Sequence, residues 1–366
     1  MLSYVFVKNN NHKSDSGSYD FTIVILPDTQ YYSASYPDIF TKQTKWIVKN
    51  KKKLDISLVL HEGDVVHNRD KEIEFRRARK SLSVLDGVVP YILSIGNNDY
   101  DPDSRDSSMF NKYFPPEKFD KIFDMGLFEN GKTENAYYLL SESGLKFIVI
   151  VIEANPRDET LKWANKIVYK YFNLPVIVLT HEYLGEGKLT VRKTENPNIN
   201  QNKTIKLNSG EDIWNKFVKH HKNIKVVFSA HVLTYNRIVQ EGINGNKVHA
   251  IEFNYQSRFT YQSGMLRIIN FDGINKKMTV KTYSPSLDVF SSDPKNDFVI
   301  EDFDFSLGSM DTISSSNKPP IVNAGVAFII RVNDVAFLDG FVIADDDNSI
   351  RQKKRIYTST SFIPLC

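Results

Sequence analysis

The chain of 366 residues has little cysteine, little net charge and no long apolar run. Its one cysteine, Cys366, excludes an internal disulfide and a thiolate metal site, so any metal ligands must be oxygen and nitrogen atoms. The 47 Lys and Arg nearly balance the 44 Asp and Glu, and a net charge of +3 gives no strong signal for nucleic-acid binding. No apolar stretch approaches the roughly 20 residues of a membrane helix, which predicts that no segment spans a bilayer.

The first residues, MLSYVFVKNNNHK, also lack the basic start and the long apolar core of a signal peptide, so the residues assign no compartment. Hydrophobic residues make up 41% and charged residues 25%, values typical of a folded globular protein. At this length we expect one large or two medium domains with ample volume for a core. The composition leaves the oligomeric state open.

Short apolar, β-branched runs recur along the chain, and each is followed at once by polar residues. Continuous runs of this length are typical of strands buried on both faces. Segments of helical periodicity lie between several of them, which predicts an α/β fold with a largely parallel central sheet. The predicted strands are residues 21–26, 56–60, 91–95, 176–179 and 226–229, and the predicted helices are residues 38–50, 70–85, 159–172 and 211–221.

The pattern changes after Lys247, where three further runs follow one another without intervening helices, at residues 248–255, 265–271 and 278–283. This arrangement predicts a second, more antiparallel sheet. A small, polar, linker-like stretch then begins after Phe305. We therefore expect four parts, namely a poorly ordered leader (1–20), a main domain (21–305), a linker (306–318) and a C-terminal β segment with a tail (319–366).

The C-terminal segment is similar to the start of a polycystic-kidney-disease-type (PKD-like) immunoglobulin-like module. The similarity rests on Pro319-Pro320, Asn323-Ala324-Gly325 and Leu338-Asp339-Gly340. Such an all-β sandwich needs about 80 to 100 residues, more than residues 319–366 supply, so we expect a truncated module. The basic stretch from Arg351 to Arg355 is not expected to continue it.

Polar residues that follow five separate predicted strands form a candidate metal site. Because α/β sheets gather their sites at the carboxyl ends of strands, we expect these side chains to converge. Two carboxylates, two imidazoles and two amides form an oxygen and nitrogen ligand set that suits Mn, Fe, Zn or Mg, and an aspartate can bridge two such ions. The set comprises Asp28, Gln30, Asp64, Asn97, His181 and His231.

These residues lie in motifs that occur in the order found in the calcineurin-like metallophosphoesterases. The motifs are Asp28-Thr29-Gln30, Gly63-Asp64, Gly96-Asn97-x-Asp99, Thr180-His181 and Ser229-Ala230-His231. From about residue 21 to residue 305 the chain resembles the branch of this family whose first motif is Asp-Thr-Gln. The resemblance implies a four-layer α/β/β/α sandwich that binds one or two divalent ions. It also implies hydrolysis of phosphate monoesters or diesters by a metal-activated water, on a phosphoester small molecule or a phosphorylated substrate.

The resemblance also assigns the ligands and the catalytic residues. It gives Asp28 and Gln30 to a first ion, Asp64 to a bridge between two ions, and Asn97, His181 and His231 to a second ion. Asn98 occupies the position of the family's histidine, and Asp99 is expected to orient it. An amide donates a hydrogen bond but delivers no proton, and general acid catalysis is worth about 10² to 10⁴-fold. We therefore expect a slow enzyme.

Two further departures concern the first ion. Leu233 stands where the wider family has a histidine ligand, although His231-Val232-Leu233 is typical of the Asp-Thr-Gln branch and so either marks the branch or is a defect. Gln30 is a weaker ligand than the usual histidine. Both predict a loosely held or exchangeable first ion, unless His249 supplies the missing imidazole. His61 and His67 flank the second motif and are also candidate ligands, although loop histidines more often only form hydrogen bonds.

Two alternatives stay open at this point. The aromatic residues after the first motif, Tyr31, Tyr32 and Tyr36, either line the substrate site or cover the sheet edge. The protein itself is either a slow phosphoesterase or a weak or inactive metal-binding sandwich that acts as a surface or ligand-binding protein. The immunoglobulin-like start motivates the second reading. The family branch and this module also suggest an exported or surface ancestor.

Overall fold

The computed structural model describes residues 20–101, 103–191, 195–198, 203–256, 264–307, 321–323, 336–343 and 351–357. The chain divides into two units, residues 1–308 and 309–366, and this boundary falls within the predicted linker. Apart from Asp20, the predicted leader lies outside the described residues, as does most of the predicted linker. Each unit is described separately below.

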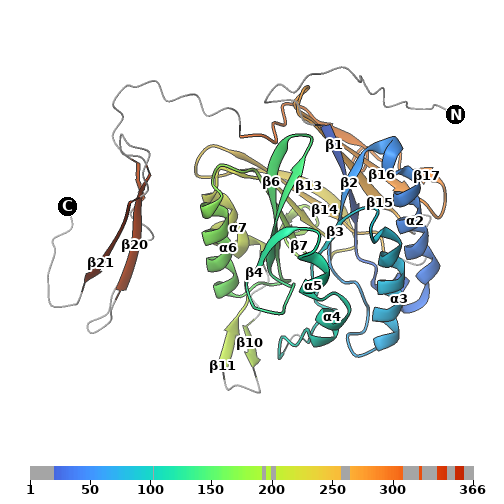
Figure 1. Ribbon diagram of the computed structural model, residues 1–366, viewed down its shortest axis with the longest axis horizontal. Coiled ribbons are helices and arrows are strands. Elements are labelled where there is room, and N and C mark those ends of the chain that lie inside the picture. Colours follow the sequence, from blue (N-terminus) through green and yellow to red (C-terminus); the bar gives the residue numbers. More distant parts are fainter. Residues whose placement is uncertain are drawn as a thin grey trace. The chain divides into compact units, whose positions relative to one another are not determined.

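Two mixed sheets form the centre of the larger unit (Figure 1). The strands of the first sheet are β1 (Asp20–Leu26), β2 (Ile56–His61), β3 (Tyr91–Leu93), β15 (Leu266–Asp272), β16 (Lys277–Ser284), β17 (Val289–Phe290) and β18 (Phe298–Ile300). Their order is β17-β16-β15-β1-β2-β3, with β18 beside β16. The strands of the second sheet are β4 (Asp124–Leu127), β5 (Ala136–Glu142), β6 (Leu145–Ile152), β7 (Val176–Thr180), β12 (Ile224–Ser229), β13 (Tyr235–Glu241) and β14 (Lys247–Phe253). Their order is β13-β14-β12-β7-β6-β5-β4.

The two sheets pack face to face through buried apolar side chains. Phe21 of β1 stacks on Phe147 of β6 with ring centroids 5.4 Å apart, and Phe271 of β15 lies 5.0 Å from Phe21 on the same sheet. Phe305 closes the cluster against Phe147 at 5.5 Å. Burying several aromatic rings in one place contributes strongly to stability, at roughly 1.5 to 3 kcal/mol for each side chain.

Helices cover the outer faces of both sheets (Figure 1). The helices on the side of the first sheet are α1 (Gln30–Ser35), α2 (Pro37–Leu54) and α3 (Glu72–Leu82), and those on the side of the second sheet are α6 (Asp158–Lys170) and α7 (Gly210–Lys216). Phe40 and Ile47 of α2 are buried, as are Leu161 and Val168 of α6, and each pair has the seven-residue spacing of one helix face. The predicted α/β sandwich is thus confirmed, and the four predicted helical segments are all present.

The predicted division of strands between sheets was wrong. The parallel strands do not form one sheet, because β1, β2 and β3 lie in the first sheet and β6, β7, β12 and β14 in the second. The antiparallel strands β15 and β16 extend the first sheet, and β14, predicted to join them, pairs in parallel with β12. A strand buried on both faces has the same apolar run in either sheet, so its residues do not reveal its partner.

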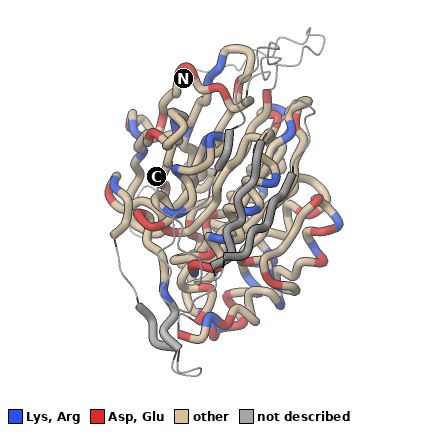
Figure 2. The backbone as a smooth tube through the Cα atoms, turned by 90° about the vertical axis from the view of Figure 1, so that its left-hand side faces the viewer, with Lys and Arg blue, Asp and Glu red and all other residues tan. Residues whose placement is uncertain are grey.

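The remaining elements of the larger unit surround the ends of the strands. They are α4 (Ser108–Tyr113), α5 (Pro116–Phe119), the short pairs β8 (Leu184–Gly185) with β9 (Lys188–Leu189) and β10 (Glu195–Asn198) with β11 (Lys203–Lys206), and the 3-10 helices η1 (Ser83–Leu85) and η2 (Val218–His220). Basic and acidic residues are interspersed along the chain (Figure 2), in line with its balanced charge. Among the described residues, every helix is too short or too polar to cross a bilayer.

The smaller unit contains an antiparallel sheet of β19 (Ile321–Asn323), β20 (Ala336–Ile343) and β21 (Arg351–Tyr357). The expectation that the basic stretch from Arg351 would leave this β unit was wrong, because Arg351 to Tyr357 pair in register with Val342 to Ala336. The likeness to a truncated PKD-like module stays a prediction.

We expect mild acid to destabilise the fold through His221, which follows η2. Burial lowers the pKa of His221 from 6.5 to about 4, and its Nε2 lies 2.7 Å from Asn165 Oδ1. The folded protein keeps this ring neutral, whereas the unfolded chain takes up a proton below pH 6.5. Stability is therefore unaffected above this pH and falls between about pH 6.5 and about pH 4, by at most about 3 kcal/mol.

Urea unfolding between these pH values measures the effect. The variant His221→Gln should lose less stability in acid than the wild type does. His220, whose Nε2 lies 2.8 Å from the carbonyl of Asn215 at the surface, is the matched control, and His220→Gln should keep most of the wild-type pH dependence. Equal pH dependence in the wild type and in His221→Gln would contradict the assignment.

Candidate metal centre

The predicted ligands follow the carboxyl ends of parallel strands from both sheets. Asp28 follows β1, Asp64 follows β2 and Asn97 follows β3, all in the first sheet. His181 follows β7 and His231 follows β12, in the second sheet. The site therefore lies where the ends of the two sheets meet, as expected for α/β proteins.

Three donor atoms converge on Nε2 of His181, which completes a set of four. Asn97 Oδ1 lies 3.1 Å from this nitrogen, His231 Nδ1 lies 3.2 Å from it and Asp64 Oδ2 lies 3.4 Å from it. Ligands held about 2.1 Å from one ion are about 3.0 Å apart in an octahedron and about 3.4 Å apart in a tetrahedron. Among the described residues, Asp64, His181 and His231 form the group of acidic and histidine side chains that fits one metal ion, and Asn97 adds an amide oxygen.

The opposite nitrogen fixes the orientation of the His181 ring. His181 Nδ1 donates to the carbonyl of Glu62 at 2.9 Å, which leaves Nε2 with its lone pair toward the other donors. Asp28 Oδ1 lies 3.5 Å from the same Nδ1, and it is a buried oxygen that accepts no hydrogen bond from any described residue. Such an oxygen fits either a cation or a supporting role behind a ligating imidazole.

The backbone at two of the four donors adopts the left-handed conformation. Asp64 has φ of +50° and His231 has φ of +65°, values that are uncommon for residues other than glycine. Gly63, at φ of +94°, makes the turn into Asp64, and a Cβ on Gly96 would overlap the Asp64 carboxylate. Two glycines thus give the loops enough room to bring Asp64 against the third motif.

The charges of the site stabilise a positive centre at its middle. Burial lowers the pKa of His181, but the neighbouring charges of Asp64 and Asp28 outweigh it and raise the pKa to about 10. Burial raises the pKa of Asp28 well above its usual range, whereas His181 and the Asn98 hydrogen bonds outweigh burial and lower that of Asp64. A metal ion therefore competes with a proton for His181, and acid should weaken metal binding.

Gln30, Asn98 and Asp99 form hydrogen bonds that the sequence did not predict. Asn98 Nδ2 donates to Gln30 Oε1 at 2.8 Å and to Asp64 Oδ2 at 2.7 Å. The Asp99 carboxylate accepts from the backbone amides of Val66 and Gly96, both at 2.9 Å. Asp99 therefore fixes the two loops that carry the motifs, and its role in orienting the Asn98 side chain stays a prediction.

The extra histidine candidates have other partners. His249 pairs with Val226 near the start of β14, and its ring packs against Phe303 at 5.2 Å, so it lies at the opposite end of the strand from the site. His61 accepts from the amide of Gly63 and donates to Thr29 Oγ1, which uses both ring nitrogens. His67 Nδ1 lies 3.0 Å from Gln30 Oε1, beside the site.

The three tyrosines after the first motif separate into different roles. The hydroxyl of Tyr32 is buried and donates to the carbonyl of Tyr255 at 2.8 Å, so this residue belongs to the core. Tyr31 packs against the His67 ring at 5.0 Å, and Tyr36 is 40% exposed. Only Tyr31 therefore contacts a residue that borders the site.

Two buried amides that the sequence reading missed hold Asp28 and His231. Asn254 Nδ2 donates to Asp28 Oδ2 at 2.6 Å and to the carbonyl of His231 at 3.0 Å. Gln256 Nε2 donates to the same Asp28 oxygen at 3.1 Å. They follow the apolar run of β14, so the rule that located the other site residues, a buried strand followed by polar residues, also applies here.

We expect Asn254→Leu, which keeps the size of the side chain but removes its donors, to weaken Mn²⁺ binding by about 10 to 100-fold. The Mn²⁺ affinity should fall because the variant lacks the two hydrogen bonds by which Asn254 links the Asp28 carboxylate to the backbone of His231. Titration calorimetry with MnCl₂ measures the affinity, and thermal unfolding reports on the fold. The control is Asn236→Leu, since Asn236 donates to Thr234 Oγ1 instead. Equal Mn²⁺ affinity in both variants would refute this role.

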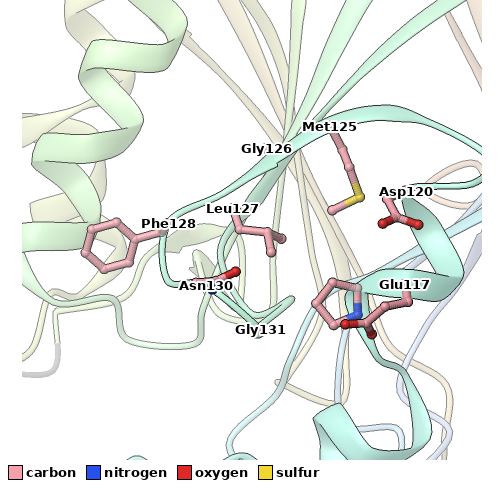
Figure 3. Close-up of a pocket in the computed structure, with 9 residues that line it drawn as sticks. Glu117, Asp120, Met125, Gly126, Leu127, Phe128, Asn130 and Gly131 are labelled. Carbon is pink, nitrogen blue, oxygen red and sulfur yellow. The ribbon is translucent and has the colours of Figure 1, made fainter.

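A pocket of about 520 Å³ between α5 and β4 shares no residue with the metal centre. Figure 3 shows the acidic side chains of Glu117 and Asp120 on the same side as Met125. The adjoining segment from Gly126 to Thr133 has the Gly-x-x-x-x-Gly-Lys-Thr spacing of a phosphate-binding loop, which normally joins a strand to a helix. Here it joins the antiparallel strands β4 and β5, and Lys132 pairs with Glu129 at 2.9 Å. This spacing therefore builds no phosphate site.

Comparisons with known proteins place the chain in a family. The family model of calcineurin-like phosphoesterases matches residues 21–235, more than half of the chain. The uncharacterized protein YvnB of Bacillus subtilis (strain 168) is 33% identical over 273 residues. That match covers 72% of this chain but 20% of YvnB, so the chain spans about a fifth of the length of this relative.

Solved structures of similar fold include a plant and a parasite protein. Purple acid phosphatase PPD1 from yellow lupin (Lupinus luteus) seeds is 16% identical, with a TM-score of 0.49, over 82% of this chain and 58% of that chain. GAP50 of Plasmodium is 10% identical, with a TM-score of 0.42, over 78% of this chain and 92% of that chain. Because the family model matches more than half of the chain, and the chain carries the five motifs in the family's order, the chain belongs to the calcineurin-like phosphoesterases.

Proposed function

We propose that this protein is a metal-dependent phosphoesterase that hydrolyses phosphate monoesters or diesters slowly. The observation that supports it best is the convergence of Asp64, Asn97 and His231 on the Nε2 of His181, at spacings that suit one divalent ion. A bound divalent ion supplies Lewis acidity, which activates water and polarises the phosphoryl group. Mn, Fe, Zn and Mg all tolerate this mixed ligand set.

The chain's own residues orient the site. Glu62 fixes the tautomer of His181 through its carbonyl, and Asn254 holds the His231 loop. Asp99 fixes the loops of the second and third motifs through two backbone amides. Prearranged donors of this kind lower the cost of reorganisation during the reaction.

The side chain of Asn98 supports the proposal that hydrolysis is slow. Its amide donates to Gln30 and Asp64, and an amide has no proton to give to a leaving group near pH 7. We expect alkyl phosphates to be cleaved more slowly than aryl phosphates, because an acidic phenol leaves without protonation.

The decisive experiment supplies the purified chain with MnCl₂ and tests p-nitrophenyl phosphate, bis-p-nitrophenyl phosphate and an alkyl phosphate. Hydrolysis that depends on Mn²⁺, with the aryl esters faster, is the expected result. A protein that binds no Mn²⁺ and cleaves neither aryl ester is not a phosphoesterase.

A second candidate function is metal or ligand binding without turnover. The hydrogen bonds of Asn98 to Gln30 and Asp64 favour this second function, because Asn98 stands at the position of the family's acid and its amide group is already bonded. Such a protein would bind Mn²⁺ with normal affinity but leave both aryl esters intact.

A further inference from the structure

Gln30 and Asn98, two of the three departures from the wider family pattern, are hydrogen-bonded to each other beside Asp64, and the third departure, Leu233, has no donor atom. The donors of the second ion are all present. We propose that this chain binds a single divalent ion, at Asp64, Asn97, His181 and His231, and that the Asn98 amide occupies the place of the first ion. The inference rests on the proposed function and narrows it to a centre with one ion.

The hydrogen bonds determine how the side-chain amide groups of Asn98 and Gln30 are oriented. A carboxylate only accepts, so the Asn98 atom that lies 2.7 Å from Asp64 Oδ2 is its NH₂ group. The same NH₂ group lies 2.8 Å from Gln30, which must therefore present its oxygen. His67 Nδ1, 3.0 Å from that oxygen, must then carry a proton. Both lone pairs of Gln30 Oε1 are thus used by donors.

The Asn98 NH₂ group and a first ion compete for the same oxygens. Its two hydrogens point to Gln30 Oε1 and Asp64 Oδ2, oxygens of the residues that the family resemblance assigns to the first ion and to the bridge between the two ions. An ion bound to both oxygens would have to displace this group. The backbone N–H of Asn98 also donates to Asp64 Oδ1 at 2.8 Å, which holds the residue in place.

Neither Leu233 nor His249 supplies the imidazole that is lost at the first position, and the Nδ1 of His67 is already bonded to Gln30 Oε1. Leu233 has no donor atom and is 58% exposed, and His249 lies at the far end of β14. Asp28 Oδ1 remains, and it faces His181 Nδ1 at 3.5 Å, where a carboxylate supports a ligating imidazole. One remaining carboxylate is a poor site for an ion that prefers about six ligands.

Counting the bound ions tests the proposal without measuring activity. The full chain, freed of metal and dialysed against MnCl₂, should contain one tightly bound Mn²⁺ by elemental analysis. Electron paramagnetic resonance should show the hyperfine pattern of an isolated ion. Two bound Mn²⁺ with a spin-coupled spectrum in the wild type would overturn the proposal.

Two variants test the part played by Asn98. Leu233→His alone restores an imidazole but keeps the amide, so it should still bind one Mn²⁺. Adding Asn98→Ala to it frees Gln30 and Asp64 and should raise the count to two, with a coupled spectrum. If the double variant stays at one Mn²⁺, the amide does not exclude the first ion and its assignment is overturned.

The two hypotheses fail in different ways. One bound ion without hydrolysis of either aryl ester would refute the proposed function and leave the one-ion centre standing. Two bound ions with Mn²⁺-dependent hydrolysis would refute the one-ion centre and leave the phosphoesterase standing.

Discussion

Asp64→Asn should abolish tight Mn²⁺ binding and reduce hydrolysis of p-nitrophenyl phosphate by about 10³-fold or more. Asp64 is the one carboxylate among the four converging donors, and its Oδ2 lies 3.4 Å from His181 Nε2. A metal ion contributes several kcal/mol to phosphoryl transfer, and about 4 kcal/mol corresponds to about 10³-fold in rate. The asparagine oxygen still accepts from the Asn98 amide, so the fold should persist. Circular dichroism and thermal unfolding check this point.

Asp86→Asn is the matched control for the loss of one carboxylate. Asp86 pairs with Arg79 and Lys118 before the start of β3, at the opposite end of the strand from the metal centre. We expect wild-type Mn²⁺ content and wild-type hydrolysis in this variant. The proposed centre is wrong if Asp64→Asn keeps its Mn²⁺ and stays within tenfold of the wild-type rate.

Asn98→His should raise the hydrolysis of alkyl phosphates tenfold or more. The imidazole supplies the proton donor that the amide lacks, and general acid catalysis is worth about 10² to 10⁴-fold. The rise should be smaller for p-nitrophenyl phosphate, whose leaving group needs no proton. The comparison of kcat for the two substrates in the wild type and the variant measures the effect.

Asn98→Ala separates proton donation from the removal of the amide. This variant loses the hydrogen bonds to Gln30 and Asp64 but gains no acid, so it should not reproduce the rise. Mn²⁺ content measured on the same samples shows whether the number of bound ions has changed. No rise in Asn98→His, with the metal still bound, would favour a binding protein over an enzyme.

The residues of the candidate metal centre were predictable because their signal is local. A buried apolar run followed by Asp, Asn or His identifies a strand end, and Asp64, Asn97, His181 and His231 all lie at such ends in the structure. The same rule finds Asn254, which was missed because β14 was assigned to a different sheet. The helices of the sandwich were predictable for the same reason, since their period is visible in the sequence.

The contacts within the site were not predictable, because they depend on distances between segments far apart in the chain. Asp99 was expected to orient its neighbour Asn98, yet its carboxylate reaches across to Val66 and Gly96. Gln30 was expected to bind metal, yet its oxygen accepts from Asn98, 68 residues away along the chain. His249 was a reasonable ligand until the register of β14 placed it opposite Val226.

The sequence by itself therefore indicated the family and an oxygen and nitrogen set of candidate metal ligands, because these follow from residue types and their position after strands. Only the tertiary structure decided which sheet each strand joins, which donors share one ion and what the Asn98 amide contacts. The physical reason is that hydrogen bonds and coordination require atoms to lie within about 3 Å of one another, and strand pairing sets those distances.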